Sequence, residues 1–354
     1  MSANESTGPR RRAIQLRVIR ALDNRHLKLT LMPTEQCNFR CTYCYEDFEL
    51  GMMPRWVVDG LKTLMTVRSP ELRVLDLRWF GGEPMMAYPI VLELNRYAQS
   101  LQQRHPQLQF LASMTTNAYL LTPERFEELL QVGVRYYQIS LDGYGEVHDR
   151  TRRRTDGAGT FDTIWSNLLA MRASPGDFEV MLRVHFTPST LPDVEKLVTV
   201  LNREFGDDNR FRIFFKAICR LGGPNNDKIE RSPEAWQQGA KARLTALVKR
   251  REEGTVDPAS STYICYAAEP NSFIVRSNGQ IARCTVAFND PRNQVGYLQP
   301  DGTLDLDIER SRLWFEGLES GDADMLHCPL NKLATMPPQL IQLSTSSARA
   351  PAAR

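Results

Sequence analysis

The stretch LKLTLMPTEQCNFRCTYC, residues 27–44, joins a strand-like segment to three closely spaced cysteines, Cys37, Cys41 and Cys44. Three thiolates on so short a loop can converge on one soft metal centre. Four thiolates would close a structural zinc site or complete the ligands of an iron–sulfur cubane. Three leave one position open for a further ligand. The spacing alone also permits a zinc loop, so the rest of the chain must decide between the two kinds of metal site.

Length, charge and cysteine usage narrow the classes of protein that the chain can be. Its 354 residues can form one large domain and a smaller one. With 44 basic and 42 acidic residues, it has no charge excess that favours nucleic acid or an anionic membrane. It has no apolar stretch of membrane-spanning length, and its start lacks the apolar core of a signal peptide. We therefore expect a cytoplasmic protein whose seven cysteines serve metal binding or catalysis rather than disulfides.

Both ends of the chain differ in composition from the rest. Residues 1–26 form an N-terminal extension that begins with a polar segment, Met1–Arg12. The tail, residues 335–354, is rich in Ser, Ala and Pro. We expect Met1–Arg12 and the tail to be disordered, because they have few large apolar residues to bury.

Strand-like and helix-like segments alternate between these ends and predict an α/β fold. Six such units in series imply a parallel sheet with its helices outside, curved into a partial (β/α)6 TIM-like barrel. The expected strands are Leu27–Met32, Val74–Phe80, Phe110–Thr115, Tyr136–Leu141, Val180–Thr187 and Phe211–Ala217. The expected helices include Pro54–Val67, Thr122–Val132, Thr160–Arg172, Leu191–Phe205 and Ser232–Glu252.

Several expected strands alternate apolar and polar residues, although a sheet covered on both faces would read as continuous apolar runs. In the fifth strand Val180, Leu182 and Val184 share one face, and Arg183 and His185 share the other. We expect the apolar faces to meet the helices and the polar faces to line an inner cavity suited to a polar ligand. An antiparallel sheet with one wet face is the alternative, but the intervening helices favour the parallel arrangement.

Further motifs follow the later strands. Gly81-Gly82-Glu83-Pro84 comes after the second strand, where glycines let the backbone approach a ligand and a carboxylate can pair with an ammonium. The third strand ends at Thr115-Thr116-Asn117. The fourth ends at Ser140-Leu141-Asp142-Gly143, followed by His148-Asp149-Arg150-Thr151-Arg152 and Gly157-Ala158-Gly159-Thr160-Phe161. Ligand sites in parallel α/β folds lie at the carboxyl ends of the strands, so these motifs and the cysteine loop indicate one site.

This set of motifs resembles that of the radical S-adenosylmethionine (SAM) enzymes, in particular the branch that modifies peptides. In that family three thiolates hold a 4Fe–4S cluster, and its fourth iron chelates SAM. An electron from an external one-electron reductant, such as flavodoxin or ferredoxin, leads to cleavage of SAM into methionine and a 5′-deoxyadenosyl radical, which abstracts a hydrogen atom. The resemblance covers roughly Lys28–Pro329 and implies a radical SAM core domain over residues 27–254.

The resemblance also implies roles for individual residues. The three cysteines of the loop would hold the cluster. Glu83 would hold the methionyl amine of SAM, Tyr43 would lie near the adenine, and Arg152 would contact the SAM carboxylate. The expected SAM-binding residues are Tyr43, Gly81, Gly82, Glu83, Pro84, Asn117, Ser140, Asp142, Arg152 and Arg183.

His185 and Cys219 are the candidates for a catalytic role. His185 points into the expected cavity, although a lone strand histidine is often structural. Cys219 follows the sixth strand, and the alternatives for it are a small buried side chain, a fourth cluster ligand or a hydrogen-atom donor.

Three more cysteines lie beyond residue 254. Asn271–Val275, the turn Ser277-Asn278-Gly279 and Ile281–Cys284 predict a β-hairpin that ends in a cysteine. This arrangement resembles the start of a SPASM or twitch domain, an extension that binds auxiliary iron–sulfur clusters, here over residues 255–334. The chain lacks the dense cysteine run of the full SPASM pattern, so it holds material for one auxiliary cluster at most. The candidate ligands are Cys265, Cys284 and Cys328, and a domain without any cluster is the alternative.

We therefore expect a radical SAM enzyme that acts on a ribosomally made precursor peptide and forms a crosslink or another modification. Sulfatase-type maturases commonly have Asp where this chain has Thr285, which argues against formylglycine formation. No leader-binding domain is recognisable before Leu27, so leader recognition would need a separate protein or be absent. A radical SAM enzyme acting on a sugar, nucleotide or amino acid is the alternative. A zinc-binding interaction protein is a third reading, from another functional class.

Overall fold

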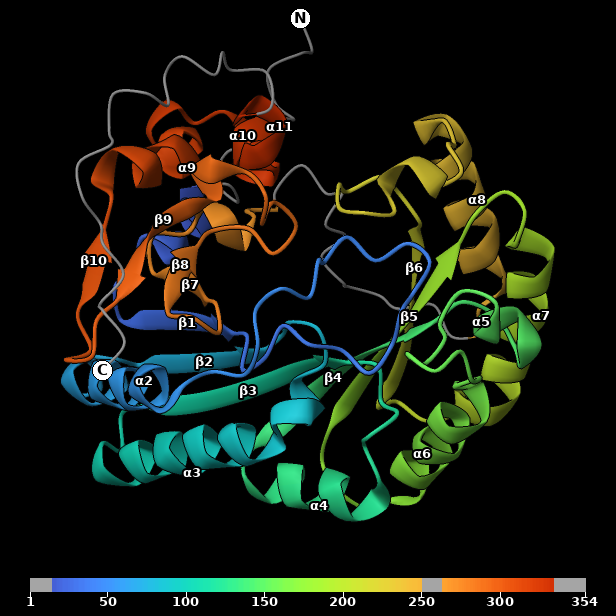
Figure 1. Ribbon diagram of the computed structural model, residues 1–354, viewed down its shortest axis with the longest axis horizontal. Helices are drawn as coiled ribbons and strands as arrows, with labels where there is room; N and C mark the ends of the chain where they lie inside the picture. The colour runs from blue at the N-terminus through green and yellow to red at the C-terminus, as the bar shows by residue number, and fades with distance from the viewer. Residues whose placement is uncertain (1–14, 250–262, 334–354) are drawn as a thin grey trace, which may run out of the picture.

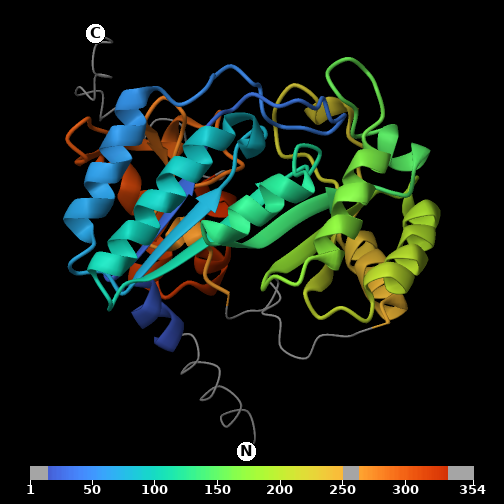
Figure 2. The ribbon, with the colours of Figure 1, turned by 90° about the horizontal axis from the view of Figure 1, so that it is seen from below.

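A computed structural model of the chain describes residues 15–249 and 263–333. Six parallel strands alternate with helices that cover the outer side of a curved sheet (Figures 1 and 2). The expected α/β fold with a partial barrel is confirmed. The strands are β1 His26–Leu31, β2 Val74–Trp79, β3 Gln109–Thr116, β4 Val134–Leu141, β5 Glu179–Phe186 and β6 Phe211–Ala217. The helices are α2 Arg55–Arg68, α3 Tyr88–Arg104, α4 Pro123–Gln131, α5 Glu146–Asp149, α6 Phe161–Ala173, α7 Leu191–Phe205 and α8 Glu234–Leu247.

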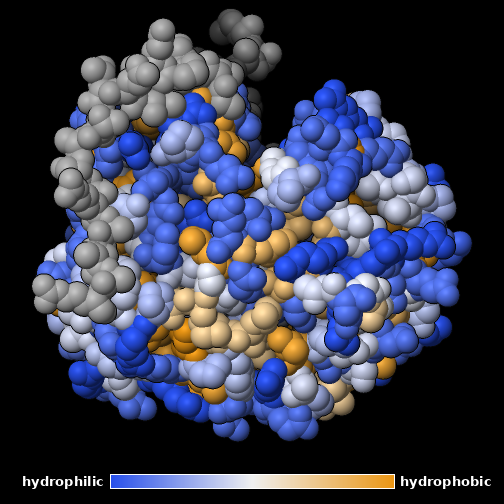
Figure 3. Space-filling model, in the orientation of Figure 1, coloured by the Kyte–Doolittle hydropathy of each residue, from blue (hydrophilic) through white to orange (hydrophobic). Residues whose placement is uncertain are grey.

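The same sheet continues into the C-terminal part of the chain. Its strand order is β10-β9-β8-β7-β1-β2-β3-β4-β5-β6, and β7 pairs in parallel with β1. The predicted hairpin is confirmed as β7 and β8, but it extends the barrel sheet instead of standing apart from it. The sheet has β10 and β6 as its two edges, so the barrel is not closed. The C-terminal helices and α8 stand on either side of an open notch in the space-filling view (Figure 3). The added elements are β7 Ser272–Val275, β8 Gln280–Ala282, β9 Gln294–Leu298, β10 Leu304–Leu306, α9 Ile308–Ser320, α10 Ala323–His327 and α11 Pro329–Leu333.

The apolar faces of the strands form the main core, as the alternation predicts. Leu27, Leu29 and Leu31 of β1 are fully buried. Their neighbours on the other face are polar, and Lys28 forms an ion pair there with Glu269. Each fully buried leucine is worth about 2–5 kcal/mol against alanine, so these rows hold the sheet under its helices and leave the inner face for a site.

The element boundaries follow the sequence in most places. Strand β6 begins and ends where it is predicted, at Phe211 and Ala217. The last predicted helix, Ser232–Glu252, is too long, because α8 ends at Leu247. The carbonyl of Leu247 accepts a hydrogen bond from Asn202 Nδ2 (2.8 Å). Asn202 Oδ1 accepts the backbone N–H of Lys249 (2.9 Å), so this side chain on α7 stops the helix.

Helix α3 follows β2, where the alternation predicts a helix without giving its bounds, and the helical spacing of its buried Val91, Leu94 and Ala98 carries the signal. The disorder expected for Met1–Arg12 and for the tail 335–354 concerns residues outside the described ranges. Among the described residues, no helix combines the length and apolar character needed to cross a membrane.

Candidate functional site

A cavity of about 180 Å³ lies where the carboxyl ends of the parallel strands meet. This is the edge at which the loops of a parallel α/β sheet build ligand sites. Side chains from the cysteine loop and from the ends of β2 to β6 converge on it. Its lining includes Cys37, Cys41, Tyr43, Cys44, Tyr45, Glu46, Phe80, Gly81, Gly82, Thr116, Asn117, Gln138, Ser140, Arg152, Arg183, His185, Lys216, Cys219 and Leu221.

The three cysteines of the loop share this cavity. Burial raises the pKa of each thiol, to about 12 for Cys44, and the charge of Glu83 raises that of Cys37 further. The thiols therefore stay protonated until a metal displaces the proton. The backbone N–H of Phe39 donates to Cys37 Sγ (3.3 Å), a contact that stabilises the thiolate form.

The Gly81–Gly82 turn packs against the backbone that leads into the cysteine loop. Gly81 has φ +110°, and a Cβ there would lie 2.4 Å from Thr34 O. A Cβ on Gly82 would lie 2.4 Å from Gln36 O. Only glycine allows this approach, so the second motif positions the segment just before Cys37.

Replacing Gly82 with alanine should destabilise the fold by at least about 1–3 kcal/mol, because the new methyl meets backbone on a second segment. Chemical unfolding of the variant would measure the loss. Gly51 is the matched control, since a Cβ there has no neighbour within 4 Å. A Gly82→Ala variant as stable as Gly51→Ala would show that the contact between Gly82 and the backbone at Gln36 is not tight.

Glu83 lies behind the cavity wall instead of on it. Its carboxylate is fully buried and accepts hydrogen bonds from Thr116 Oγ1 (2.7 Å) and from the backbone N–H groups of Met85 (3.0 Å) and Asn117 (2.7 Å). In this structure the side chain therefore joins the turn after β2 to the end of β3. Pro84 is also absent from the described cavity lining.

A buried network of hydrogen bonds joins Tyr43 of the cysteine loop to Asp142, Arg152 and His185. The hydroxyl of Tyr43 donates to Asp142 Oδ1 (2.9 Å) and accepts from Arg152 Nη1 (2.9 Å). His185 Nδ1 lies 3.0 Å from the same Asp142 oxygen. Burial would raise the pKa of Asp142, but the hydrogen bond and charge of His185, with the charge of Arg152, hold it below its usual value. Because Asp142 is anionic, Nδ1 of His185 carries the proton and donates it in a hydrogen bond to the carboxylate. This tautomer leaves Nε2 of His185 as an acceptor.

His148, the histidine of the motif that follows β4, has a structural role. It is fully buried, and its Nδ1 accepts the backbone N–H of Asp142 (3.3 Å). Its Nε2 is buried without a hydrogen-bond partner among the described residues. Burial lowers the pKa of His148 to about 4, so the folded chain prefers the neutral ring.

This histidine should make stability depend on pH. Its unfolded pKa is about 6.5, so the unfolded chain binds the proton first as the pH falls. The contribution of His148 is complete above about pH 6.5, and about 3 kcal/mol of it should be lost as the pH falls towards 4. Urea unfolding at a series of pH values would measure this slope, which His148→Gln should reduce. Equal slopes in both proteins would contradict the assignment.

Three cavity-lining residues hold buried polar atoms that lack hydrogen-bond partners within the described ranges, namely Arg152 Nε, Arg183 Nε and Glu46 Oε2. An unmet buried donor or acceptor costs about 1–3 kcal/mol. Two of the three are guanidinium donors, which suit an anionic group such as a carboxylate. Three soft thiols beside such donors fit a three-thiolate iron–sulfur cluster together with an anionic organic ligand.

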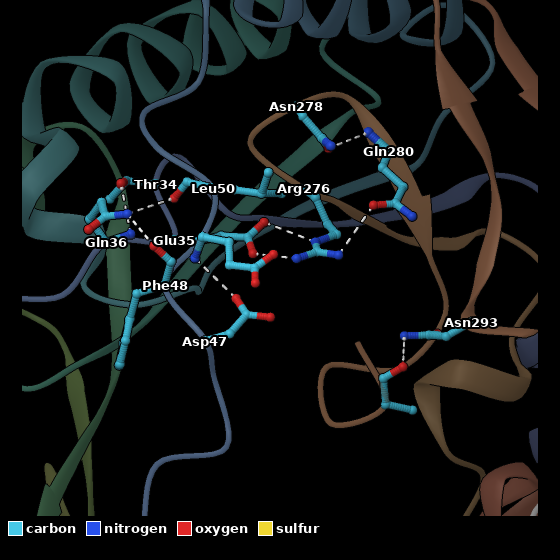
Figure 4. A network of polar contacts seen from close by, with 12 residues as sticks. Thr34, Glu35, Gln36, Asp47, Phe48, Leu50, Arg276, Asn278, Gln280 and Asn293 are labelled. Carbon is cyan, nitrogen blue, oxygen red and sulfur yellow. Dashed lines mark hydrogen bonds and ion pairs between the residues drawn. The ribbon is translucent and has the colours of Figure 1, made fainter. Parts of the chain in front are cut away.

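An ion pair joins the cysteine loop to the C-terminal hairpin. Arg276, at the end of β7, contacts both oxygens of Glu35 (Nε–Oε1 3.0 Å and Nη2–Oε2 2.6 Å), as Figure 4 shows. Both side chains are nearly fully buried. Burial, Glu35 and Asp47 raise the pKa of Glu46 to about 8, and Arg276 opposes this shift. Arg276 is therefore the cation that faces this group of carboxylates.

The C-terminal cysteines lie on neighbouring segments. The backbone N–H of Cys265 donates to Leu326 O (2.8 Å), two residues before Cys328. The charges of Cys284 and Cys328 add to burial in raising the pKa of Cys265 to about 12. The Asn293 carboxamide binds the backbone N–H and C=O of Cys284 (both 2.8 Å) and fixes its loop. Within the described ranges, no three His, Cys, Asp or Glu side chains are arranged to hold a single metal ion.

Most of the expected site residues meet at the cavity, and their orientation agrees with the predicted strand phases. Asp142, Glu83 and Pro84 lie behind it and shape it indirectly. The Cys219 thiol donates weakly to Ala217 O (3.4 Å). The prediction missed Lys216, although the alternation of β6 places it on the inner face. It also missed Glu35, Arg276 and Asn293, whose partners lie on other elements, and Glu46, whose pKa is shifted by charges that include the distant Arg276.

Comparison with known sequences places part of the chain in a family. Residues 31–200 match the model described as the radical SAM superfamily. The GTP 3′,8-cyclase of Cyanothece sp. (strain PCC 7425 / ATCC 29141) is 36% identical over 149 residues, 41% of this chain and 43% of that protein. That of Rhodopirellula baltica (strain DSM 10527 / NCIMB 13988 / SH1) is 30% identical over 196 residues, 51% of each. The chain thus spans about half the length, or less, of these curated relatives.

Solved structures share the fold over more of the chain. anSMEcpe with bound AdoMet and Cp18Cys peptide has a TM-score of 0.59 at 18% identity, covering 82% of this chain and 84% of that one. Streptococcus suis SuiB bound to the precursor peptide SuiA has a TM-score of 0.59 at 15% identity, covering 88% and 70%. The match to the radical SAM superfamily, a superfamily of enzymes, spans the cysteine loop and strands β2 to β5, and the two solved structures share the fold over most of the chain.

Proposed function

We propose that this chain is a radical SAM enzyme that cleaves SAM reductively and abstracts a hydrogen atom from a ribosomally made peptide. The product would be a crosslink or another post-translational modification. The proposal rests on the cavity in which Cys37, Cys41 and Cys44 meet Gly82 and the unmet Nε of Arg152. A 4Fe–4S cluster bound there supplies the electron that cleaves SAM into methionine and a 5′-deoxyadenosyl radical.

The residues around the cavity have separate tasks in this proposal. The three thiols lose their protons and hold the cluster. The Gly81–Gly82 turn lets a ligand approach the backbone, and Glu83 fixes this turn against β3. Arg152 and Arg183 offer buried donors to the SAM carboxylate. His185 presents an Nε2 acceptor, oriented by Asp142, to SAM or substrate.

The shared fold supports a peptide as the substrate. The folds of anSMEcpe and SuiB, each solved with a peptide, match this chain over 82% and 88% of its length. We propose that Cys265, Cys284 and Cys328 hold one auxiliary iron–sulfur cluster. That cluster would take up the electron left after an oxidative crosslink, or bind the substrate.

A second candidate is a radical SAM enzyme that acts on an anionic small molecule. The curated relatives are GTP 3′,8-cyclases, although they match only part of the chain. Lys216 and Arg183 on the inner wall would suit the phosphate groups of a nucleotide.

Mass spectrometry after incubation with candidate substrates tests both functions, modification of a peptide and conversion of a small molecule. The reconstituted enzyme is given SAM, a reductant and either peptides from neighbouring short reading frames or GTP. A peptide that loses two hydrogens indicates a crosslink, and one of unchanged mass that gains deuterium from solvent indicates epimerisation. Conversion of GTP with every peptide unchanged would favour the second candidate. Absence of SAM cleavage under all conditions would refute both.

A further inference from the structure

One carboxyl group of the cavity wall has no task in the proposed function. Glu46 comes two residues after Cys44 and lines the cavity. Its Oε2 is buried and has no hydrogen-bond partner among the residues that the structure describes. A buried acceptor without a donor is costly, and a ligand that donates a hydrogen bond to it removes that cost. The charges around Glu46 indicate which kind of donor fits.

The charged groups that act on Glu46 are two acids and one base. Besides burial, the charges of Glu35 and Asp47 oppose a negative charge on Glu46, and that of Arg276 favours it. Each nitrogen of the Arg276 guanidinium already has another acceptor. Its Nε and Nη2 contact Glu35 (3.0 and 2.6 Å), and its Nη1 donates to Gln280 Oε1 (3.2 Å). Three carboxyl groups therefore share one guanidinium, and a second cation is favoured beside them.

Two further charges on the same loop leave this balance unchanged. Arg40 stacks on the ring of Phe48, with its guanidinium carbon 4.3 Å from the ring centre, and its Nη1 donates to Cys37 O (2.8 Å). Glu49 follows Phe48 in the chain and is exposed. These two charges are of opposite sign, and neither residue lines the cavity or is among the charges that act on Glu46. The surroundings of Glu46 therefore remain acidic.

The cavity also has a basic end. Arg152 and Arg183 each hold a buried Nε that no described residue pairs with, and Lys216 lies beside His185 in the pairing of β5 with β6. None of these three cations is among the charges that act on Glu46, so the acidic and basic groups of the wall are separate. An anion such as the SAM carboxylate suits the basic end, which leaves Glu46 for a cationic group of the substrate.

We propose that Glu46 binds a basic group of the substrate, the ammonium of a lysine or the guanidinium of an arginine in the peptide. This inference rests on the proposed function and narrows the substrate to peptides that carry a basic residue beside the reacting position. The carboxylate accepts charge-assisted hydrogen bonds from such a group, and the charges of Glu35 and Asp47 add to the attraction. The same acids repel the phosphates of a nucleotide, so this end of the cavity favours the peptide over the second candidate.

Two capped tripeptides test the proposal by anaerobic calorimetry with the reconstituted full chain and bound SAM. One is N-acetyl-Gly-Lys-Gly-amide, which carries an ammonium and no terminal charges. The other has norleucine in place of lysine, a straight apolar side chain without the ammonium. Wild-type protein should bind the lysine peptide about tenfold or more tightly than the norleucine peptide.

Two variants assign this preference to one side chain. Glu46→Gln keeps the size of the side chain and removes its charge, so it should bind the two peptides equally. Glu49→Gln is the matched control, because it makes the same change at an exposed position of the same loop outside the cavity lining. It should keep the wild-type preference for lysine. Iron content and thermal unfolding would show that both variants are folded.

Three results would overturn the proposal. In the first, wild-type protein binds the two peptides equally, or binds neither at millimolar concentration. In the second, Glu46→Gln keeps the preference for lysine. In the third, Glu46→Gln loses affinity for SAM or for guanosine and not for the lysine peptide, which would assign Glu46 to the SAM amine or to a nucleobase. Failure of the proposed function is distinguishable, because binding needs no turnover: SAM would then stay intact with dithionite while the preference for lysine persisted.

Discussion

Replacing Cys41 with alanine should remove one cluster, about four irons per chain, and reduce 5′-deoxyadenosine formation to that of the enzyme-free control. Cys41 lines the cavity with Cys37 and Cys44, and two thiolates would leave a second iron without its protein ligand. Iron analysis and chromatography of the reaction mixture would measure both effects.

Two other cysteines supply controls for this result. Cys219→Ala should keep the wild-type iron content, because Cys219 belongs to neither cysteine group and its Sγ contacts Ala217 O and Gln237 Oε1. Cys265→Ala should lose only the auxiliary iron and keep the signal of the SAM-binding cluster. Wild-type iron and 5′-deoxyadenosine in Cys41→Ala would show that the loop is not the cluster site.

Replacing Arg276 with methionine should lower the free energy of unfolding by about 3–5 kcal/mol, because it leaves Glu35 buried without its cation. Glu35 directly precedes the backbone that packs on Gly82, so SAM binding should weaken as well. Urea unfolding and equilibrium binding of SAM would measure the two effects.

The double variant E35Q/R276M should recover much of the lost stability, since it removes the unpaired charge. Arg55→Met is the control, because Arg55 is 60% exposed in its pair with Asp59 and should cost at most about 1 kcal/mol. A loss in Arg276→Met no larger than that in Arg55→Met would contradict the proposed coupling between the hairpin and the cysteine loop.

Local sequence patterns were sufficient for the barrel and for much of its inner wall. The alternation of β5 places Arg183 and His185 at the cavity, and the same rule places Ser140 there from β4. Each depends on one strand and its period of two, so no distant partner had to be known.

Contacts between distant segments carry what the sequence could not predict. Arg276 and Glu35 are 241 residues apart, and no local period relates them. The Gly81–Pro84 motif indicates that Glu83 is a ligand-binding carboxylate. In the structure, donors at the end of β3 form hydrogen bonds with this carboxylate. The parallel pairing of β7 with β1 likewise depends on the folded sheet. The turn that predicted the hairpin contains no information about this pairing, so the hairpin was assigned to a separate domain.

Electron paramagnetic resonance of the anaerobically reconstituted, dithionite-reduced chain, with and without SAM, tests the central claim most directly. We expect a reduced 4Fe–4S signal that SAM changes, and release of 5′-deoxyadenosine from the same sample. Cys41→Ala should lack both. A colourless protein that holds one tightly bound zinc, gives no such signal and leaves SAM intact would contradict the claim.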